Sequence, residues 1–203
     1  MTQLQLSTLL FLAGVIWFVL LLVNGVAVEL TWLKVLPTVA SVLFVLVGSY
    51  ERWLWKLPLI RPLLSKRPVL EGTWRATVRP QGREHLDAFM VVAQTYSSLR
   101  MRLLSAEAAS EALSGTVAAK KDGGHQIAAL YRSTPRLSVR KQSPIHFGAM
   151  LLEAHDDPVS VLIGHYWTDR RTMGELELRE RHRTHASSFE DASRLFSAAV
   201  PGR

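Results

Sequence analysis

Polar side chains are densest in residues 164–174, which read Gly-His-Tyr-Trp-Thr-Asp-Arg-Arg-Thr-Met-Gly. The hydroxyls, aromatic rings and arginines of this run could bind a polar ligand by hydrogen bonding and stacking. A second interpretation is that Asp169 and Arg170 only form a hairpin turn, which the neighbouring hydroxyls cap. The sequence leaves both interpretations open for these two residues.

The period of the flanking residues indicates which of these side chains share a face. If Leu176 and Leu178 point into a buried interior, strict alternation places Thr172 there too. The preceding strand would turn a matching set the same way, namely Leu162, Gly164, Tyr166 and Thr168. Further stacking and hydrogen-bonding groups could come from Trp74, Gln94, Ser97, Ser98 and Tyr131. Trp74 could equally be an ordinary core residue.

Signatures of catalysis are missing from the sequence. It contains no phosphate-cradling G-x-x-x-x-G-K-[ST] motif, no H-E-x-x-H and no G-x-S-x-G. The absence of cysteine excludes disulfides, thiolate metal sites and cysteine nucleophiles. His182 and His185 could share a metal ion only against the repulsion of nearby arginines, and Asp156-Asp157-Pro158 is ordinary turn chemistry. We therefore expect a non-enzymatic protein without a metal or cofactor.

Short alternating segments after Gly72 predict an all-β domain. The eight candidate strands are Gly72–Val78, Leu86–Thr95, Ser98–Leu104, Glu111–Ala119, His125–Arg132, Phe147–Ala154, Val159–Thr168 and Thr172–Arg181. Eight antiparallel strands with one apolar face must close or leave edges exposed, so we expect a small antiparallel β-barrel. Such a barrel is either filled by side chains or holds one small ligand. Ser188–Val200 reads as a short C-terminal helix, because Ser188 and Asp191 resemble a capping box.

The first fifty residues differ in composition from the rest, with Glu29 and Lys34 as their only charged side chains. Leu6–Val28 exceeds the ~20 apolar residues that a membrane-crossing helix needs, and Trp32–Ser49 is a second, shorter apolar run. The first run lacks the Lys or Arg n-region of a cleavable secretory signal. We therefore expect a membrane-anchored chain with two transmembrane helices in residues 1–50.

Basic residues after the second run predict the orientation of the chain. Arg52, Lys56, Arg61, Lys66 and Arg67 are opposed there only by Glu51, and such flanks remain in the cytoplasm. We expect a basic juxtamembrane linker at residues 51–68 and a cytoplasmic ligand-binding barrel at 69–187. The C-terminal helix and tail would then occupy residues 188–203.

The order of these parts resembles a known family. The junction Glu51-Arg52-Trp53-Leu54-Trp55-Lys56-Leu57-Pro58 and the run Gly72-Thr73-Trp74 come first, followed by the Tyr-Trp-Thr-Asp-Arg-x-Thr-x-Gly hairpin. Together with the two apolar segments, they are similar to the two-transmembrane, β-strand-rich effectors of bacterial cyclic-oligonucleotide antiphage signalling systems (CBASS). The resemblance spans essentially the whole chain and is most specific in residues 164–174.

The resemblance implies a receptor for a cyclic dinucleotide that a partner nucleotidyltransferase (CD-NTase) makes during phage infection. The ligand would drive homo-oligomerisation and damage to the lipid bilayer of the bacterial inner membrane, ending in abortive infection. Carried over to this sequence, the ligand contacts would come from Tyr166, Thr168, Arg170 and Thr172, with the arginine meeting a phosphate and the tyrosine stacking on a base. It implies no DNA or RNA polymer as a partner.

Two other functions stay open on the sequence. A lipocalin-like barrel would bind an apolar molecule, so its interior should not contain Tyr166, Thr168 and Thr172. A non-enzymatic adaptor should have a barrel filled by side chains and a bare outer patch for a protein partner. The contents of the barrel therefore distinguish the three functions.

Overall fold

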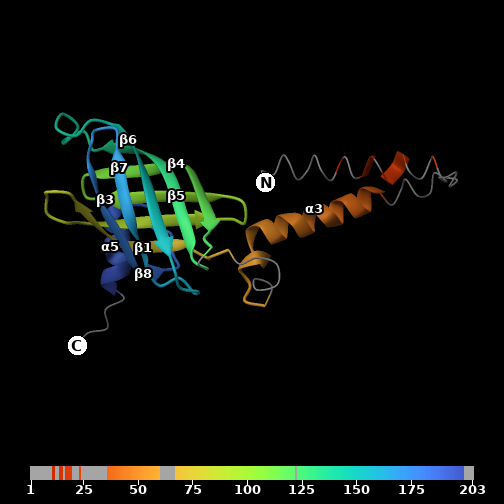
Figure 1. Ribbon diagram of the computed structural model, residues 1–203. Coiled ribbons are helices and arrows are strands. Elements are labelled where there is room, and N and C mark those ends of the chain that lie inside the picture. The colour runs from red at the N-terminus through yellow and green to blue at the C-terminus, as the bar shows by residue number, and fades with distance from the viewer. Residues whose placement is uncertain are drawn as a thin grey trace. The chain divides into compact units, whose positions relative to one another are not determined.

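The chain is described from a computed structural model, which covers residues 11, 14–15, 17–19, 23, 36–59, 67–121 and 123–198 (Figure 1). The helical elements are α3 (Leu36–Arg52), η1 (Leu54–Lys56) and α5 (Phe189–Ala198). The strands are β1 (Gly72–Pro80), β2 (Leu86–Gln94), β3 (Leu99–Ser105), β4 (Ala108–Ala119), β5 (His125–Pro135), β6 (His146–Ala154), β7 (Leu162–Thr168) and β8 (Met173–His182). The chain divides into two compact units, residues 1–65 with 95–97 and residues 66–94 with 98–203.

The eight strands form a closed antiparallel barrel in sequence order. Each strand pairs with the next, and β1 closes the barrel by pairing with β8, for example Ala76 with Leu178. A β-bulge between Trp74 and Arg75 and another between Ala112 and Ser114 locally increase the twist of the strands. The predicted eight-stranded antiparallel barrel is confirmed, because the period-two pattern gave every strand one face to bury.

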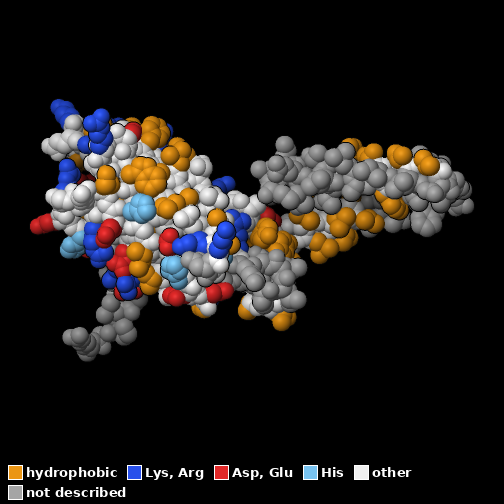
Figure 2. Space-filling view, in the orientation of Figure 1, with side chains coloured by type: hydrophobic (Ala, Val, Ile, Leu, Met, Phe, Trp, Pro, Cys, Tyr) orange, Lys and Arg blue, Asp and Glu red, His pale blue; other side chains and the backbone are white. Residues whose placement is uncertain are grey.

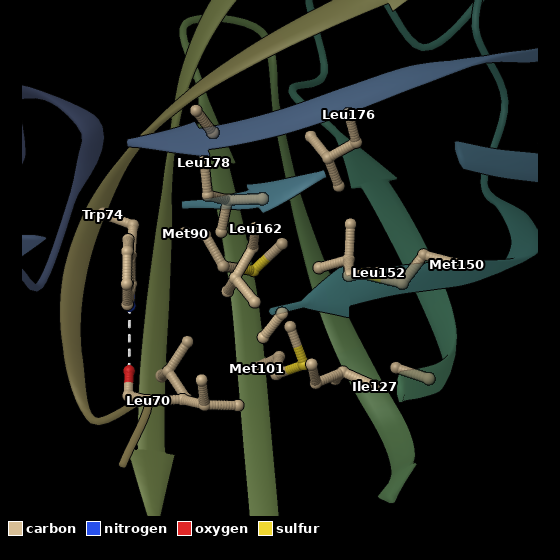
Figure 3. Packing of buried hydrophobic residues seen from close by; sticks show 14 of the residues in the cluster. Leu70, Trp74, Met90, Met101, Ile127, Met150, Leu152, Leu162, Leu176 and Leu178 are labelled. Atoms are coloured by element: carbon tan, nitrogen blue, oxygen red, sulfur yellow. Dashed lines mark hydrogen bonds between the residues drawn. The ribbon is translucent and has the colours of Figure 1, made fainter. Parts of the chain in front are cut away.

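The interior of the barrel is filled by large apolar side chains. Trp74, Met90, Leu152, Leu162 and Leu178 have no exposed surface, and Figure 3 shows side chains from strands around the barrel pointing toward one another. Each fully buried side chain of this size contributes about 1.5–3 kcal/mol. The prediction of a polar hollow is therefore wrong for the centre of the barrel, which is packed with apolar side chains, and the buried polar residues lie toward its ends.

Strand boundaries depart from the predicted ones where pairing, rather than composition, decides them. β4 begins at Ala108, three residues before the predicted Glu111, because it pairs on both sides with β3 and β5 despite its alanine-rich sequence. β7 begins at Leu162 and not at Val159, because its first pairs are Leu162 with Leu178 of β8 and Ile163 with Glu153 of β6. Val159 is buried without belonging to a strand.

The C-terminal helix α5 packs on the outer face of the barrel. Phe196 stacks on Phe89 of β2 at 5.3 Å between ring centroids, and Ala192 is fully buried in the same cluster. The Ser188 hydroxyl accepts a hydrogen bond from the Asp191 amide at 3.1 Å, which confirms the predicted N-cap. The helix ends at Ala198, whereas the predicted end at Val200 lies outside the described residues.

In the smaller unit, the end of α3 contacts residues 95–97, which form the turn between β2 and β3. The Glu51 carboxylate accepts hydrogen bonds from the Thr95 hydroxyl at 2.5 Å and from the amide and hydroxyl of Ser97 at 2.9 and 2.6 Å. Tyr96 packs its ring against Tyr50. The turn is therefore held by both hydrogen bonds and aromatic packing.

The predicted membrane segments fall largely on this unit. Most of Leu6–Val28 lies outside the described residues, and the predicted run Trp32–Ser49 corresponds to α3. Among the residues that the structure describes, no helix is both long enough and apolar enough to cross a bilayer.

Candidate functional site

The candidate site is the end of the barrel formed by the β1–β2, β3–β4, β5–β6 and β7–β8 turns, which we call the mouth. Alternation turns Tyr131 of β5 and Tyr166 of β7 inward there, above the apolar core. Each tyrosine ring lies against a glycine. A Cβ on Gly148 would come within 2.5 Å of the Tyr131 ring, and one on Gly174 would meet the Tyr166 ring at 2.9 Å. Only glycine therefore leaves room for these rings.

Of the two mouth tyrosines, Tyr131 is buried and Tyr166 is partly buried, and the two phenols interact electrostatically. Burial raises the pKa of the Tyr131 phenol well above its ordinary value, and Tyr166 and Asp169 add to the shift. Burial also raises the pKa of Tyr166, which Arg83 of the β1–β2 turn partly opposes. Neither phenol forms a hydrogen bond with another described residue. Both hydroxyls are therefore neutral donors and acceptors that a ligand could use.

A pair of buried serines lies beside Tyr131. Ser110 of β4 and Ser133 of β5 are register partners, and their side chains are 8% and 4% exposed. They lie beyond Tyr131, toward the β5–β6 loop, and add a polar pair to the mouth. Sequence reasoning missed both residues, although the alternation that places Tyr131 inside also places Ser133 inside.

The β7–β8 hairpin is held by its own hydroxyls. The Thr168 and Thr172 hydroxyls are 2.7 Å apart, and the Thr168 hydroxyl also accepts a hydrogen bond from the Arg170 amide at 3.2 Å. Asp169 accepts a hydrogen bond from the Phe147 amide at 3.1 Å. Thr172 is exposed, so the prediction that it faces the interior is wrong: β8 begins only at Met173, and Thr172 belongs to the turn.

Arg170 links this hairpin to the β5–β6 loop. Its guanidinium donates hydrogen bonds to the Ser143 hydroxyl at 3.0 Å and to the Gln142 carbonyl at 3.4 Å. Both acceptors are neutral, so an anion would be a stronger partner for the same guanidinium. In the structure Arg170 therefore serves the turn, and it is also placed to bind a phosphate.

The loops around the mouth are basic. The loops and turns at this end carry Arg83, Arg136, Arg140, Lys141, Arg170 and Arg171, and Figure 2 shows Lys and Arg side chains gathered at this end of the barrel. Acidic groups are fewer, and Asp169 is bound to backbone while Glu190 of α5 pairs with Arg136 at 2.8 Å. The local field at the mouth therefore favours an anionic ligand.

Three predicted site residues lie at the opposite end of the barrel. Trp74 donates a hydrogen bond to the Leu70 carbonyl at 2.8 Å, and Gln94 bridges the Leu70 amide at 2.8 Å and the Pro68 carbonyl at 3.0 Å. Ser98 directly precedes β3, at the β2–β3 turn. The structure brings Tyr131, Tyr166, Thr168 and Arg170 together but separates them from these three. Trp74 and Gln94 instead stabilise the segment that leads into β1.

The histidines near the C-terminal end contact backbone groups. His185 lies 2.9 Å from the Val92 carbonyl, and His182 contacts the Thr184 amide. Within the described ranges, no three His, Asp or Glu side chains are grouped as metal ligands.

The raised pKa values of Tyr131 and Tyr166 make a prediction about alkaline titration. A phenol whose folded pKa exceeds its unfolded value of about 10 adds stability that is complete below that pH and is lost as the pH rises through the folded pKa. We expect the phenolate absorbance of the folded chain to rise in steps, with the Tyr131 step last. Tyr131→Phe should delete that last step. Ionisation of Tyr131 near pH 10 in folded protein would contradict its burial at the mouth.

A closed barrel with phenols, hydroxyls and guanidiniums at one basic end defines a ligand-binding domain of the receptor class. Comparison with known sequences identifies the family. The chain belongs to the family described as Cap15, cyclic dinucleotide receptor domain, whose model matches residues 65–180. It is also 28% identical over 170 residues to CD-NTase-associated protein 15 of Staphylococcus schleiferi, covering 82% of this chain and 90% of that relative. The resemblance to CBASS receptors is thereby confirmed.

Proposed function

We propose that this chain is a CBASS effector that binds a cyclic dinucleotide at the mouth of its barrel. The observation that carries the proposal is the match of the cyclic dinucleotide receptor family to residues 65–180, which include the mouth and nearly all eight strands. The basic loops around the mouth support it, because a cyclic dinucleotide carries two negative phosphates.

The contacts of Arg170 suggest how the ligand is received. Its guanidinium now binds the neutral Ser143 hydroxyl and Gln142 carbonyl. A phosphate would form charge-assisted hydrogen bonds of roughly twice their strength, so Arg170 would exchange these partners for the ligand. The β5–β6 loop would lose a tether at the same moment. Ligand binding and loop rearrangement are therefore coupled through one side chain.

The mouth tyrosines complete the proposed site. Tyr166 would stack on a base, and the Tyr131 hydroxyl would donate or accept a hydrogen bond. The barrel is filled below them, so the ligand would rest on the Tyr131 and Tyr166 layer and not enter the core. The filled interior also argues against a lipocalin-like carrier of an apolar molecule.

The downstream steps follow the family expectation and are part of the proposal. A partner CD-NTase would supply the ligand, and the bound receptor would form homo-oligomers and disrupt the bacterial inner membrane. The composition of residues 6–28 and the exposed apolar side chains of α3, such as Phe44 and Val45, support an anchor in the bilayer. The barrel would then lie in the cytoplasm, as the basic flank after α3 indicates.

A second candidate is a non-enzymatic adaptor that binds another protein. Two observations favour it: the filled interior and the apolar outer face of β4–β7. An adaptor would need no ligand at the mouth, so a ligand screen separates the two functions.

The test is calorimetric and thermal-shift titration of the full chain in detergent with a panel of cyclic dinucleotides. At a ligand concentration 100 times Kd, binding adds about 2.7 kcal/mol and should raise Tm by roughly 5–10 °C. Linear dinucleotides with the same bases and inorganic phosphate serve as controls for nonspecific anion binding. If no cyclic dinucleotide exceeds these controls, the receptor function is wrong and the adaptor gains support.

A further inference from the structure

Most of the outer surface of the barrel is occupied by charges or by the helix α5. On β1 and β8, Arg79 pairs with Glu177 at 3.0 Å and Arg75 with Glu180 at 3.3 Å. On β2 and β3, the apolar side chains of Phe89, Val91 and Leu104 are buried beneath α5. The ion pairs present polar groups to water on β1 and β8, and α5 shields the apolar groups of β2 and β3 from water.

No described part of the barrel unit covers the outer face of β4–β7, and the centre of this face carries no charge. The outward residues of two adjacent cross-strand rows are Ser114, Leu130, Ala149 and Trp167, and Thr116, Ala128, Leu151 and His165. None of them is Lys, Arg, Asp or Glu. Leu130 and Trp167 are 47% and 46% exposed, and Figure 2 shows hydrophobic side chains gathered on this face. We call these eight residues the β4–β7 face.

We propose that the β4–β7 face is the surface on which a second copy of this chain docks. Patches of exposed apolar side chains on soluble domains mark interaction sites, and the contrast with the rest of the barrel shows that this one is local. In this interface the β4–β7 face of one copy packs against the β4–β7 face of the other.

The shape of the face suits a copy of itself. Small residues such as Ser114, Ala128 and Ala149 line a hollow of about 330 Å³ at the β4–β7 face, and Trp167 forms one side of it. The hollow and the exposed ring of Trp167 therefore lie side by side on one surface. In a two-fold interface each copy presents the same patch, so a ring of one copy can enter the hollow of the other.

Charge also selects this partner. Each chain carries a formal net charge of +7, so two copies repel unless they meet where neither has charge. The β4–β7 face is such a place. An acidic protein partner would instead be drawn to the basic mouth.

The size of the face predicts a weak interaction. Four strands about 4.8 Å apart and about four residues long at ~3.4 Å each give a footprint of roughly 260 Å² per copy. The roughly 520 Å² of a pair is below the ~1,200–2,000 Å² of a stable complex. Copies would therefore be monomeric when dilute and would associate when a shared membrane raises their effective concentration. This inference extends the oligomerisation step of the proposed function, but the face does not require a ligand.

Site-specific cross-linking of the full chain in lipid vesicles tests the interface. The protein has no cysteine, so a single introduced thiol is unique. Ser114→Cys should cross-link to itself through a short bismaleimide at least tenfold more than Arg100→Cys, a matched control on the outer side of β3. Equal yields for the two variants would overturn the proposal.

A second variant tests the chemistry of the face. Leu130→Arg places a charge at its centre on a side chain that is already half exposed, so the barrel should keep its melting temperature. In the Ser114→Cys background it should reduce cross-linking by at least tenfold, whereas Ala93→Arg on β2 should leave it unchanged. Cross-linking that survives Leu130→Arg would show that the copies do not meet at this face.

Two further readouts separate this inference from its alternatives. If an environment-sensitive dye on Ser114→Cys is buried equally at all protein-to-lipid ratios, lipid and not a second copy covers the face, and the proposal fails. Calorimetry with cyclic dinucleotides is run on the same variants. Loss of all ligand binding with intact cross-linking would refute the receptor function and support the interface.

Discussion

Replacing Arg170 by alanine is expected to weaken cyclic dinucleotide binding by about 10- to 100-fold, or ~1.4–3 kcal/mol. The described contacts of the Arg170 guanidinium, the Ser143 hydroxyl and the Gln142 carbonyl, are neutral groups that a phosphate can displace. The loss should be measured by calorimetry on the full chain in detergent. Because the side chain is exposed, the melting temperature without ligand should change little.

The neighbouring Arg171 provides the matched control. It lies in the same turn, at a positive φ of 59°, and its replacement by alanine removes the same charge from the same loop. Arg171→Ala should weaken cyclic dinucleotide binding by less than threefold, since Arg171 contributes only to the general electrostatic field of the mouth. Arg170→Lys should be intermediate, because it keeps the charge but not the planar fork of donors. Equal losses for Arg170→Ala and Arg171→Ala would remove Arg170 from direct contact with the ligand.

The largest expected effect on stability is that of Gly164→Val in β7. A Cβ at this position would overlap the carbonyl oxygen of Leu151 in β6, and the obstacle is backbone, which cannot rotate away. The strand would have to move from its partner. We expect a loss of about 3 kcal/mol or more and a fall in Tm of roughly 6–12 °C, measured by thermal denaturation.

Gly115→Ala is the graded comparison for that variant. A Cβ there would lie 3.0 Å from the Leu99 carbonyl oxygen, so a small shift of the neighbouring strand suffices. Its Tm should fall by less than half as much. If Gly164→Val melts like the unmodified chain, β6 and β7 are farther apart than the structure places them.

The barrel could be predicted because its strands combine short apolar alternation with turn residues. Leu162, Leu176 and Leu178 all face inward as predicted, and Gly164 lies on the predicted face. The reason for Gly164 could not be predicted, since it is the approach of another strand and not a ligand. Pairing also set the start of β4, where an alanine-rich composition gave only a weak signal.

The site was predicted less completely because a polar residue type does not reveal its partner. Gln94 looked like a ligand contact, but the unpaired backbone of Leu70 and Pro68 next to β1 needs its amide. Trp74 was consistent with both core and site, and its burial makes it core. Ser133 was overlooked because a single hydroxyl does not suggest a site, although strand alternation places it on the same face as Tyr131. Only the closed barrel brings Tyr131 and Tyr166 together.

The closure of β1 on β8 has one further consequence. Every strand has a hydrogen-bonded neighbour on both sides, so the barrel offers no row of open amides and carbonyls for another chain to extend. Many copies can therefore remain close together without joining into fibres. Contacts between two such barrels are then limited to their side chains.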